Sequence, residues 1–159
     1  MTNAGRPAPW AARRSCAFNR KDRMSRANVE VVERFEDAFV RGDMEEVLSL
    51  VSPDVVVHEA PSLPYPGDHR GHEGFLRLTD AFNSVWEITS ELDLTFLDAG
   101  DTHVVVLVAY DVVARPTGIP LRLRMVEVYA IANGQIAELE VYYHDTAAIV
   151  EATGGLKVL

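Results

Sequence analysis

Four segments in the second half of the chain are rich in β-branched and aromatic residues, a composition typical of β-strands. They span residues 91–98, 102–115, 119–132 and 135–144, and the turn-forming sequences PTG and NG separate the last three. This pattern predicts four antiparallel strands, most of them long. Any fold of this chain must therefore be organised around an extended sheet.

The segment THVVVLVAYDVVAR, residues 102–115, is apolar on both of its faces. Side chains alternate along a strand, so Val104 and Val106 point to one side while Val105 and Leu107 point to the other. A strand that is apolar on both sides is usually covered on both. Because the predicted helices are too few to cover two faces, we expect the convex face of the sheet to meet a second copy of the chain in a homodimer.

The first half of the chain is predicted to be mainly helical. Apolar residues recur every three or four positions over residues 28–41 and 74–86, and a shorter helix fits residues 44–51. A strand is expected over residues 55–60, followed by a long loop with several prolines over residues 61–73, which could act as a lid or binding segment. Three N-terminal helices packed on a highly curved, mostly antiparallel sheet describe an α+β fold.

Length and composition fit one globular domain. The chain has 159 residues, of which 48% are hydrophobic and 25% charged, enough for a sizeable core. Residues 1–24 combine scattered arginines with two prolines and show no sustained periodicity. We expect them to form a flexible basic tail, and residues 25–159 to form the folded domain.

Charge and cysteine content argue against several classes of partner. The formal net charge is −9, and it is −15 without the basic residues 1–26, so neither nucleic acid nor a membrane surface is an expected partner. The single cysteine, Cys16, cannot form an intramolecular disulfide, which favours a cytoplasmic location. No apolar run approaches the length of a membrane-spanning helix.

Glu127 is a charged residue in an otherwise apolar row of side chains. It shares one face of its predicted strand with Leu123, Met125, Tyr129 and Ile131. Burial raises the pKa of a carboxyl group toward the range in which it exchanges protons near neutral pH. We therefore expect Glu127 to project into a hydrophobic cavity. The alternative is a structural glutamate held by a tyrosine or by backbone donors.

Two further carboxylates are candidates for the same cavity. Glu59 follows Val55 and Val57 on the inward face of the first predicted strand, although a solvated charge at the end of a strand would show the same pattern. Asp145 continues the inward phase of the last strand after Tyr143. It also precedes the sequence TAAIVEA, where its side chain could instead cap a helix.

The remaining candidate residues would shape the cavity or bind its ligand. His69, in the loop, could act as a gate or as an acid–base group, or could simply be exposed. The histidines lack a helical zinc-binding spacing such as HExxH, and nucleotide-binding fingerprints are missing, so we expect neither a metal nor a cofactor. The candidate substrate-binding residues are Phe35, Tyr65, His69, Trp86, Tyr110, Met125, Tyr129 and Tyr143.

Three segments resemble the nuclear transport factor 2-like superfamily, especially SnoaL-like polyketide cyclases and ketosteroid-isomerase-like proteins. They read VVERFEDAFVRGDMEEVLSLVSPDVVVHEAP, YPGDHRGHEGF and VEVYAIANGQIAELEVYYHD, and the resemblance covers residues 25–155. It implies a cystatin-like cone. It does not imply one particular activity, because this fold hosts isomerases, cyclases, dehydratases, epoxide hydrolases and non-catalytic binders.

The resemblance also implies roles for particular residues. The general base of ketosteroid isomerases would fall at Glu59, and the protonated acid of their oxyanion site at Glu127. Their oxyanion tyrosine would fall at Phe35, which has no hydroxyl, and the arginine of limonene-type epoxide hydrolases would fall at Met125. SnoaL-like cyclases use an acidic residue near the terminal strand, a role open to Asp145 or Glu127.

Residue patterns and resemblance together predict a cofactor-independent acid–base enzyme. Its substrate would be a hydrophobic, oxygenated small molecule of polyketide or terpenoid type, converted by cyclisation, isomerisation or epoxide opening. Glu59 is the expected base, and Glu127 the acid or its partner. The competing prediction is a non-catalytic ligand-binding or interaction module of the same fold.

Overall fold

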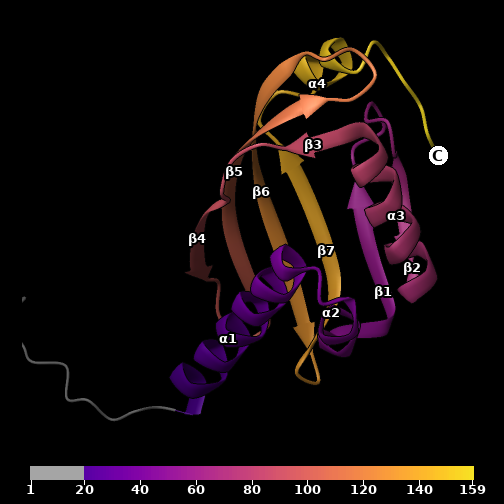
Figure 1. Cartoon of the computed structure of the whole chain (residues 1–159). Coiled ribbons are helices and arrows are strands. Elements are labelled where there is room, and N and C mark those ends of the chain that lie inside the picture. The colour runs from indigo at the N-terminus through magenta and orange to yellow at the C-terminus, as the bar shows by residue number, and fades with distance from the viewer. Residues whose placement is uncertain (1–19) are drawn as a thin grey trace, which may run out of the picture.

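The structure is a computed structural model that describes residues 20–159, with side chains from residue 25 onward (Figure 1). The predicted tail falls mostly outside the described residues, although the first helix already begins at Arg20. In chain order the elements are α1 (Arg20–Arg41), α2 (Met44–Leu50), β1 (Val51–Glu59), β2 (Gly67–Arg70), α3 (Gly71–Val85), β3 (Trp86–Ile88), β4 (Asp93–Asp98), β5 (His103–Ala114), β6 (Pro120–Ala132), β7 (Gln135–Tyr143) and α4 (Thr146–Ala152).

All seven strands form one sheet, in the order β2-β1-β7-β6-β5-β3, with β4 also pairing with β5. Every pairing is antiparallel except that between β1 and β7. The four strands predicted in the second half are therefore confirmed as β4 to β7. The predicted α+β class with a mostly antiparallel sheet is confirmed as well.

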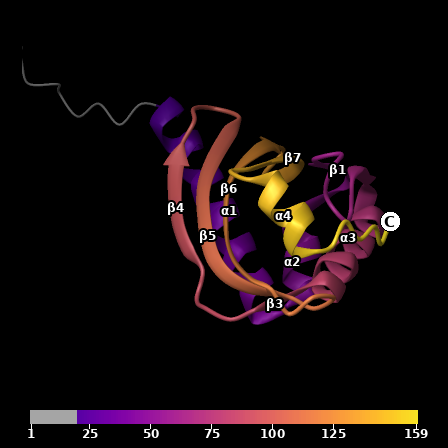
Figure 2. The same cartoon turned by 90° about the horizontal axis from the view of Figure 1, so that it is seen from above.

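The sheet curls into a half-barrel around the interior of the molecule. Figure 2 shows β4 and β5 on one side, α3 closing the opposite side, and α4 lying over one end. Helix α1 packs against β4 and β5. The concave side of the sheet is thus enclosed by helices, while the convex side has no cover within the described part of the chain.

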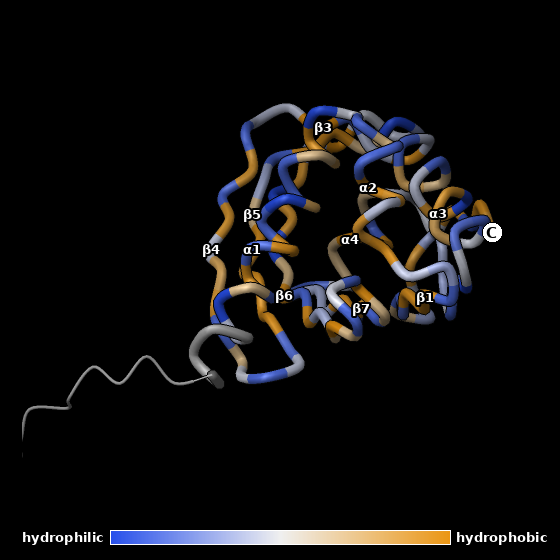
Figure 3. The backbone as a smooth tube through the Cα atoms, turned by 90° about the horizontal axis from the view of Figure 1, so that it is seen from below, coloured by the Kyte–Doolittle hydropathy of each residue, from blue (hydrophilic) through white to orange (hydrophobic). Residues whose placement is uncertain are grey.

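The two faces of β5 differ in burial, although most residues on both faces are apolar. Its inward side chains form part of the core. Figure 3 shows hydrophobic and hydrophilic residues alternating along the neighbouring strand β4. On the outward face, Leu107 is 42% exposed. The second copy expected to cover this face stays a prediction. The buried inward residues of β5 are Val104, Val106, Val108, Tyr110, Val112 and Ala114.

Several boundaries in the first half differ from the prediction. The segment predicted as a long loop contains β2, which pairs with β1, as well as the first turn of α3. Strand β1 begins at Val51 and continues through Pro53, because a break in its register with β7 accommodates the proline. Trp86 belongs to β3, where it pairs with Ala114 of β5, and not to the preceding helix.

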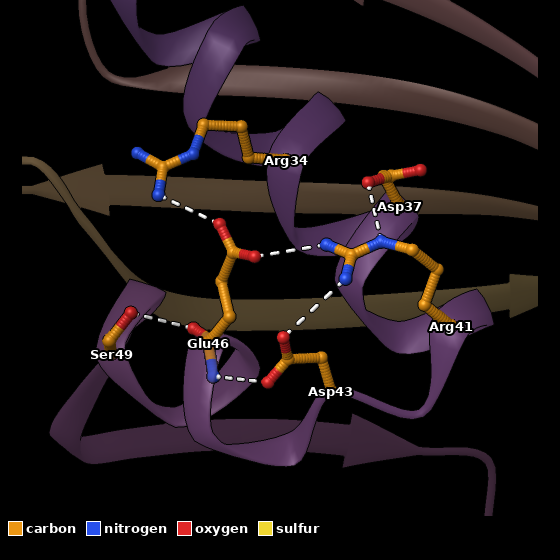
Figure 4. A network of polar contacts seen from close by, with 6 residues as sticks. All are labelled: Arg34, Asp37, Arg41, Asp43, Glu46 and Ser49. Carbon is orange, nitrogen blue, oxygen red and sulfur yellow. Dashed lines mark hydrogen bonds and ion pairs between the residues drawn. The ribbon is translucent and has the colours of Figure 1, made fainter.

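A polar network joins α1 to α2 (Figure 4). The chain turns at Gly42 with a positive φ of 71°, and Asp43 caps α2 by accepting a hydrogen bond from the Glu46 amide at 3.1 Å. The Glu46 carboxylate accepts hydrogen bonds from Arg34 at 2.9 Å and from Arg41 at 3.0 Å. None of the helices in residues 20–159 is long and apolar enough to cross a membrane.

Candidate active site

A cavity of about 1020 Å³ lies on the concave side of the sheet, bordered by α1 and α3. This is at the upper end of the roughly 300–1000 Å³ typical of small-molecule sites. Aromatic and aliphatic side chains make up most of its wall, and the described part of that wall contains no lysine, arginine, histidine or cysteine. The aromatic lining residues are Phe35, Phe39, Phe75, Phe82, Phe96, Tyr110, Tyr129 and Tyr143.

Glu127 lines this cavity, as its position in an apolar row predicts. It lies in the middle of the sheet, opposite Val106 of β5 and Val141 of β7. Its Oε2 accepts a hydrogen bond of 2.7 Å from the hydroxyl of Tyr129, two residues further along the same face of β6. The two alternatives for Glu127 are therefore compatible, because the residue lines the cavity and its carboxyl group is also held by a tyrosine.

A second carboxyl group, that of Glu36 on α1, shares the same tyrosine. The Tyr129 hydroxyl lies 2.5 Å from Glu36 Oε1, and Glu36 is only 6% exposed. The sequence analysis missed Glu36, although a signal for it exists. Glu36 follows the buried Val32 by four positions and precedes Phe39 by three, which places it on the inward face of α1.

Burial makes ionisation of both Glu36 and Glu127 unfavourable. Burial raises the pKa of Glu36, and the hydrogen bond from Tyr129 only partly opposes this effect. Burial, reinforced by the nearby charge of Glu36, raises the pKa of Glu127 well above that of an ordinary glutamate. Two buried carboxylates in contact cannot both ionise readily, so we assign the proton to Glu127.

Glu59 lies at the end of β1 and lines the cavity. It is therefore not a solvated charge at the end of a strand. Its Oε2 is buried and has no hydrogen-bond partner. Burial raises the pKa of Glu59 to about 8, while an interaction with the Tyr143 hydroxyl acts in the opposite direction. At pH 7 only about one tenth of such a group is ionised, so a small change in its surroundings switches its charge.

Tyr65 and Trp86 support this end of the cavity from behind. Both are buried, and the Trp86 indole donates a hydrogen bond of 3.0 Å to the Tyr65 hydroxyl. Tyr65 in turn interacts with the hydroxyl of Tyr143, which lines the cavity next to Glu59. Burial raises the pKa of Tyr65 and of Tyr143, so both phenols stay neutral hydrogen-bonding groups.

Five of the predicted substrate-binding residues line the cavity, while three do not. Tyr65 and Trp86 lie behind the wall, as described above. His69 is not an exposed loop residue, because β2 holds it 8% exposed, with its Nε2 3.1 Å from the Tyr65 carbonyl oxygen. The predicted residues that do line the cavity are Phe35, Tyr110, Met125, Tyr129 and Tyr143.

Asp145 lies outside the cavity. It is exposed, and its Oδ1 accepts a hydrogen bond of 3.0 Å from the Ala148 amide at the start of α4. The capping role that the sequence also allowed is therefore the one that the structure contains. A residue that continues the inward phase of a strand need not point inward once the strand has ended, and β7 ends at Tyr143.

A possible metal-ligating group within residues 25–159 lies on the convex face of the sheet, away from the cavity. It consists of His58, Glu138 and Glu140. The His58 ring nitrogens already contact Asp68 at 2.7 Å and Glu138 at 2.8 Å. Partial burial lowers the pKa of His58, but these two carboxylates outweigh it and leave the pKa raised. An imidazolium ion between carboxylates explains this cluster without a metal.

Comparison with known proteins agrees with this architecture. The sequence profile of the SnoaL-like domain family matches residues 32–139, the segment that contains Glu36, Glu59 and Glu127. A comparison with proteins of curated function gave no significant match.

Solved structures show the same fold. A nuclear transport factor 2-like protein from Burkholderia xenovorans is 24% identical, with a TM-score of 0.73 over 80% of this chain and 96% of its own. A protein from Xanthomonas campestris, provisionally called a polyketide cyclase, is 17% identical, with a TM-score of 0.67 over 82% and 98%. One from Rhodopseudomonas palustris, provisionally called an isomerase, is 18% identical, with a TM-score of 0.65 over 78% and 96%.

At these identities the structures establish the fold and leave the chemistry open. The profile match covers more than half of the chain, including the two strand positions and the helix position of the buried carboxyl groups. The chain therefore belongs to the SnoaL-like domain family and has the cystatin-like fold of nuclear transport factor 2-like proteins.

Proposed function

We propose that this protein is a cofactor-independent acid–base enzyme that acts on a hydrophobic, oxygenated small molecule. One observation carries this proposal: Glu59 and the Glu36–Glu127 pair line a single apolar cavity but differ in their partners. Carboxyl groups whose surroundings set them apart in this way can serve as base and acid in one reaction.

The reaction class that fits best begins with removal of a proton next to a carbonyl group. The ionised form of Glu59 takes the proton from carbon, and the electrons of the broken C–H bond move onto the carbonyl oxygen. The proton held by Glu127 and Glu36 stabilises that oxygen by hydrogen bonding or transfer. Isomerisation of a double bond and aldol cyclisation both pass through such an enol.

The cavity wall favours this chemistry because much of it is apolar. Phe35, Phe75 and Phe39 pack around one end of the cavity, with ring centroids 6.0 to 6.4 Å apart. An apolar wall strengthens the hydrogen bonds made to a developing oxyanion. Because Phe35 brings no hydroxyl and Tyr129 already donates to carboxyl groups, the acidic proton of the pair is the donor that we assign to the substrate oxygen.

Deuterium uptake from D2O tests this function without knowledge of the natural substrate. The bicyclic ketone tetralone is hydrophobic and carries exchangeable protons beside its carbonyl, so NMR can follow its exchange with and without the protein. We expect the wild type to accelerate exchange and Glu59→Gln to lose this acceleration by about a hundred- to ten-thousand-fold.

Glu151→Gln serves as the matched control, because Glu151 is exposed on α4 and does not line the cavity. It should exchange tetralone like the wild type. Binding of tetralone without faster exchange would favour the competing function, a non-catalytic binding module. Acceleration that persists in Glu59→Gln would remove Glu59 from the mechanism.

A further inference from the structure

The charged groups around the cavity are all of one sign. Six carboxyl side chains line it, and no cationic side chain does so among the described residues. The negative charge of Asp37, at the rim, is partly compensated by Arg41, whose Nε lies 3.0 Å from the Asp37 carboxylate. Arg41 itself does not line the cavity. The six are Glu33, Asp37 and Glu91, which are exposed at the rim, and Glu36, Glu59 and Glu127 inside.

Inside the cavity, Glu59 has an oxygen that the protein leaves unsatisfied. Its Oε2 is buried and receives no hydrogen bond, whereas the carboxyl groups of Glu36 and Glu127 share the Tyr129 hydroxyl. In the ionised form of Glu59 this oxygen is a buried acceptor without a donor, which is unfavourable, and a bound molecule that brings a donor relieves it. The vacant oxygen therefore identifies where the polar part of a ligand belongs.

We propose that the hydrophobic, oxygenated ligand of this cavity also carries an amine, which binds as its ammonium ion among the buried carboxyl groups and ionises Glu59 as it binds. An ammonium ion supplies several N–H donors and a positive charge, which the carboxyl-lined wall lacks among its described residues. The acidic rim attracts cations and repels anions. Aromatic faces such as those of Phe35 and Tyr129, whose rings lie 5.9 Å apart, add a favourable surface for a cation and its apolar body.

Ionisation of Glu59 follows from the groups that face it. These groups are Tyr65, Tyr110, Glu127 and Tyr143, and each of them is neutral or acidic. In the free protein, burial raises the pKa of Glu59 to about 8, so the group is mostly protonated near neutral pH. A cation within a few ångströms favours the carboxylate. Binding of the amine therefore releases a proton and converts Glu59 into the base that the proposed reaction needs.

Calorimetry with three ligands of one shape tests this inference. Naphthylmethylamine, naphthalenemethanol and naphthoate share their apolar body and differ in charge, so their affinities at pH 7 isolate the effect of charge. We expect the amine to bind at least about tenfold more tightly than the alcohol, and the carboxylate to bind most weakly. Titrations in phosphate and in Tris, whose ionisation heats differ, should show nearly one proton released by the amine and none by the alcohol.

Two variants locate the effect. Glu59→Gln should abolish proton release and most of the preference for the amine, while Glu151→Gln should keep both. An alcohol that binds as tightly as the amine, or an amine that binds without proton release, would overturn the inference, and both results come from the wild type alone.

Because this substrate class rests on the proposed function, the two failures must be separable. Calorimetry needs no turnover, and tetralone exchange needs no amine. Loss of the amine preference with tetralone exchange intact would contradict only the ligand class. Absence of exchange with the amine preference intact would contradict only the enzymatic function.

Discussion

The two faces of the curled sheet carry the same kinds of acidic side chain under opposite conditions. On the convex face, carboxylates lie beside cations: Asp68 and Glu138 contact His58, and Asp111 accepts a hydrogen bond of 3.1 Å from Arg122. On the concave face, the polar neighbours of the Glu127 carboxyl group are the Glu36 carboxyl group and the Tyr129 hydroxyl. Strand β6 borders both environments. Its Arg122 pairs with Asp111 on the convex face, while its Glu127 points to the opposite side, into the cavity.

The comparison shows that surroundings, more than residue type, decide what a carboxyl group does. The hydrogen bond with His58 is the main reason why the pKa of Asp68 is lowered, while burial raises the pKa of Glu59 to about 8. Exposed ion pairs contribute only about 0–1 kcal/mol each to stability. The convex acids are therefore ordinary surface charges, whereas the concave acids are unfavourable when ionised and available for proton transfer.

The largest expected difference between the faces is in activity. Glu127→Gln should slow tetralone exchange by about a hundred-fold or more, because an amide is a weaker donor to a developing oxyanion than a carboxylic acid. Glu138→Gln, the same change on the convex face, should leave the exchange rate within about twofold of the wild type. Equal losses in the two variants would contradict the distinction between the faces.

Stability should fall as the pH rises from about 5 to 8. In this window the native protein holds a proton on Glu59 that the unfolded chain has already released, so each pH unit costs about 1.4 kcal/mol for this group. Above pH 8 the contribution of Glu59 becomes constant. Urea unfolding at several pH values measures the slope.

Glu59→Gln removes this titration and should therefore be more stable than the wild type at pH 8, by an amount smaller at pH 5. Glu138→Gln should retain the slope of the wild type. A Glu59→Gln variant whose stability has the same pH slope as the wild type would show that Glu59 is not held in its protonated form.

Removing a tyrosine hydroxyl from either face should change the free energy of unfolding by less than the pH effect at Glu59. Tyr129→Phe removes the hydroxyl that lies between two buried carboxyl groups and should lower the free energy of unfolding by about 1–3 kcal/mol. Tyr142→Phe removes a hydroxyl that bonds to Glu140 on the convex face, where Tyr142 is 56% exposed. Measured at a concentration at which the chain is monomeric, that change should stay within about 0.5 kcal/mol of the wild type. Denaturant unfolding of both variants makes the comparison, and similar losses would argue against the buried cluster.

The convex face supplies the remaining prediction. Leu107 and Tyr142 are exposed there and border a shallow hollow with Arg124. We propose that a second copy of the chain covers this hollow, so that Leu107→Asp should weaken dimerisation by about tenfold or more. Sedimentation at micromolar concentration measures it. A wild-type monomer at that concentration would contradict the homodimer.

Much of this arrangement could be predicted from periodicity. Alternation along strands identified the inward positions of Glu59 and Glu127, because the period of a strand holds over its whole length. It failed at Asp145, where the strand had ended. It could not show that Glu36 meets Glu127, because that contact depends on how α1 crosses the sheet. The burial of His69 depends likewise on β2, which a segment with several prolines does not suggest.

The most direct test of the account is a titration of the glutamate side-chain carboxyls by NMR, with Glu59→Gln used to assign one resonance. We predict that this resonance titrates with a pKa of about 8. A Glu59 resonance that titrates near the value of about 4.3 of a free glutamate would contradict the central claim that the cavity keeps this carboxyl protonated.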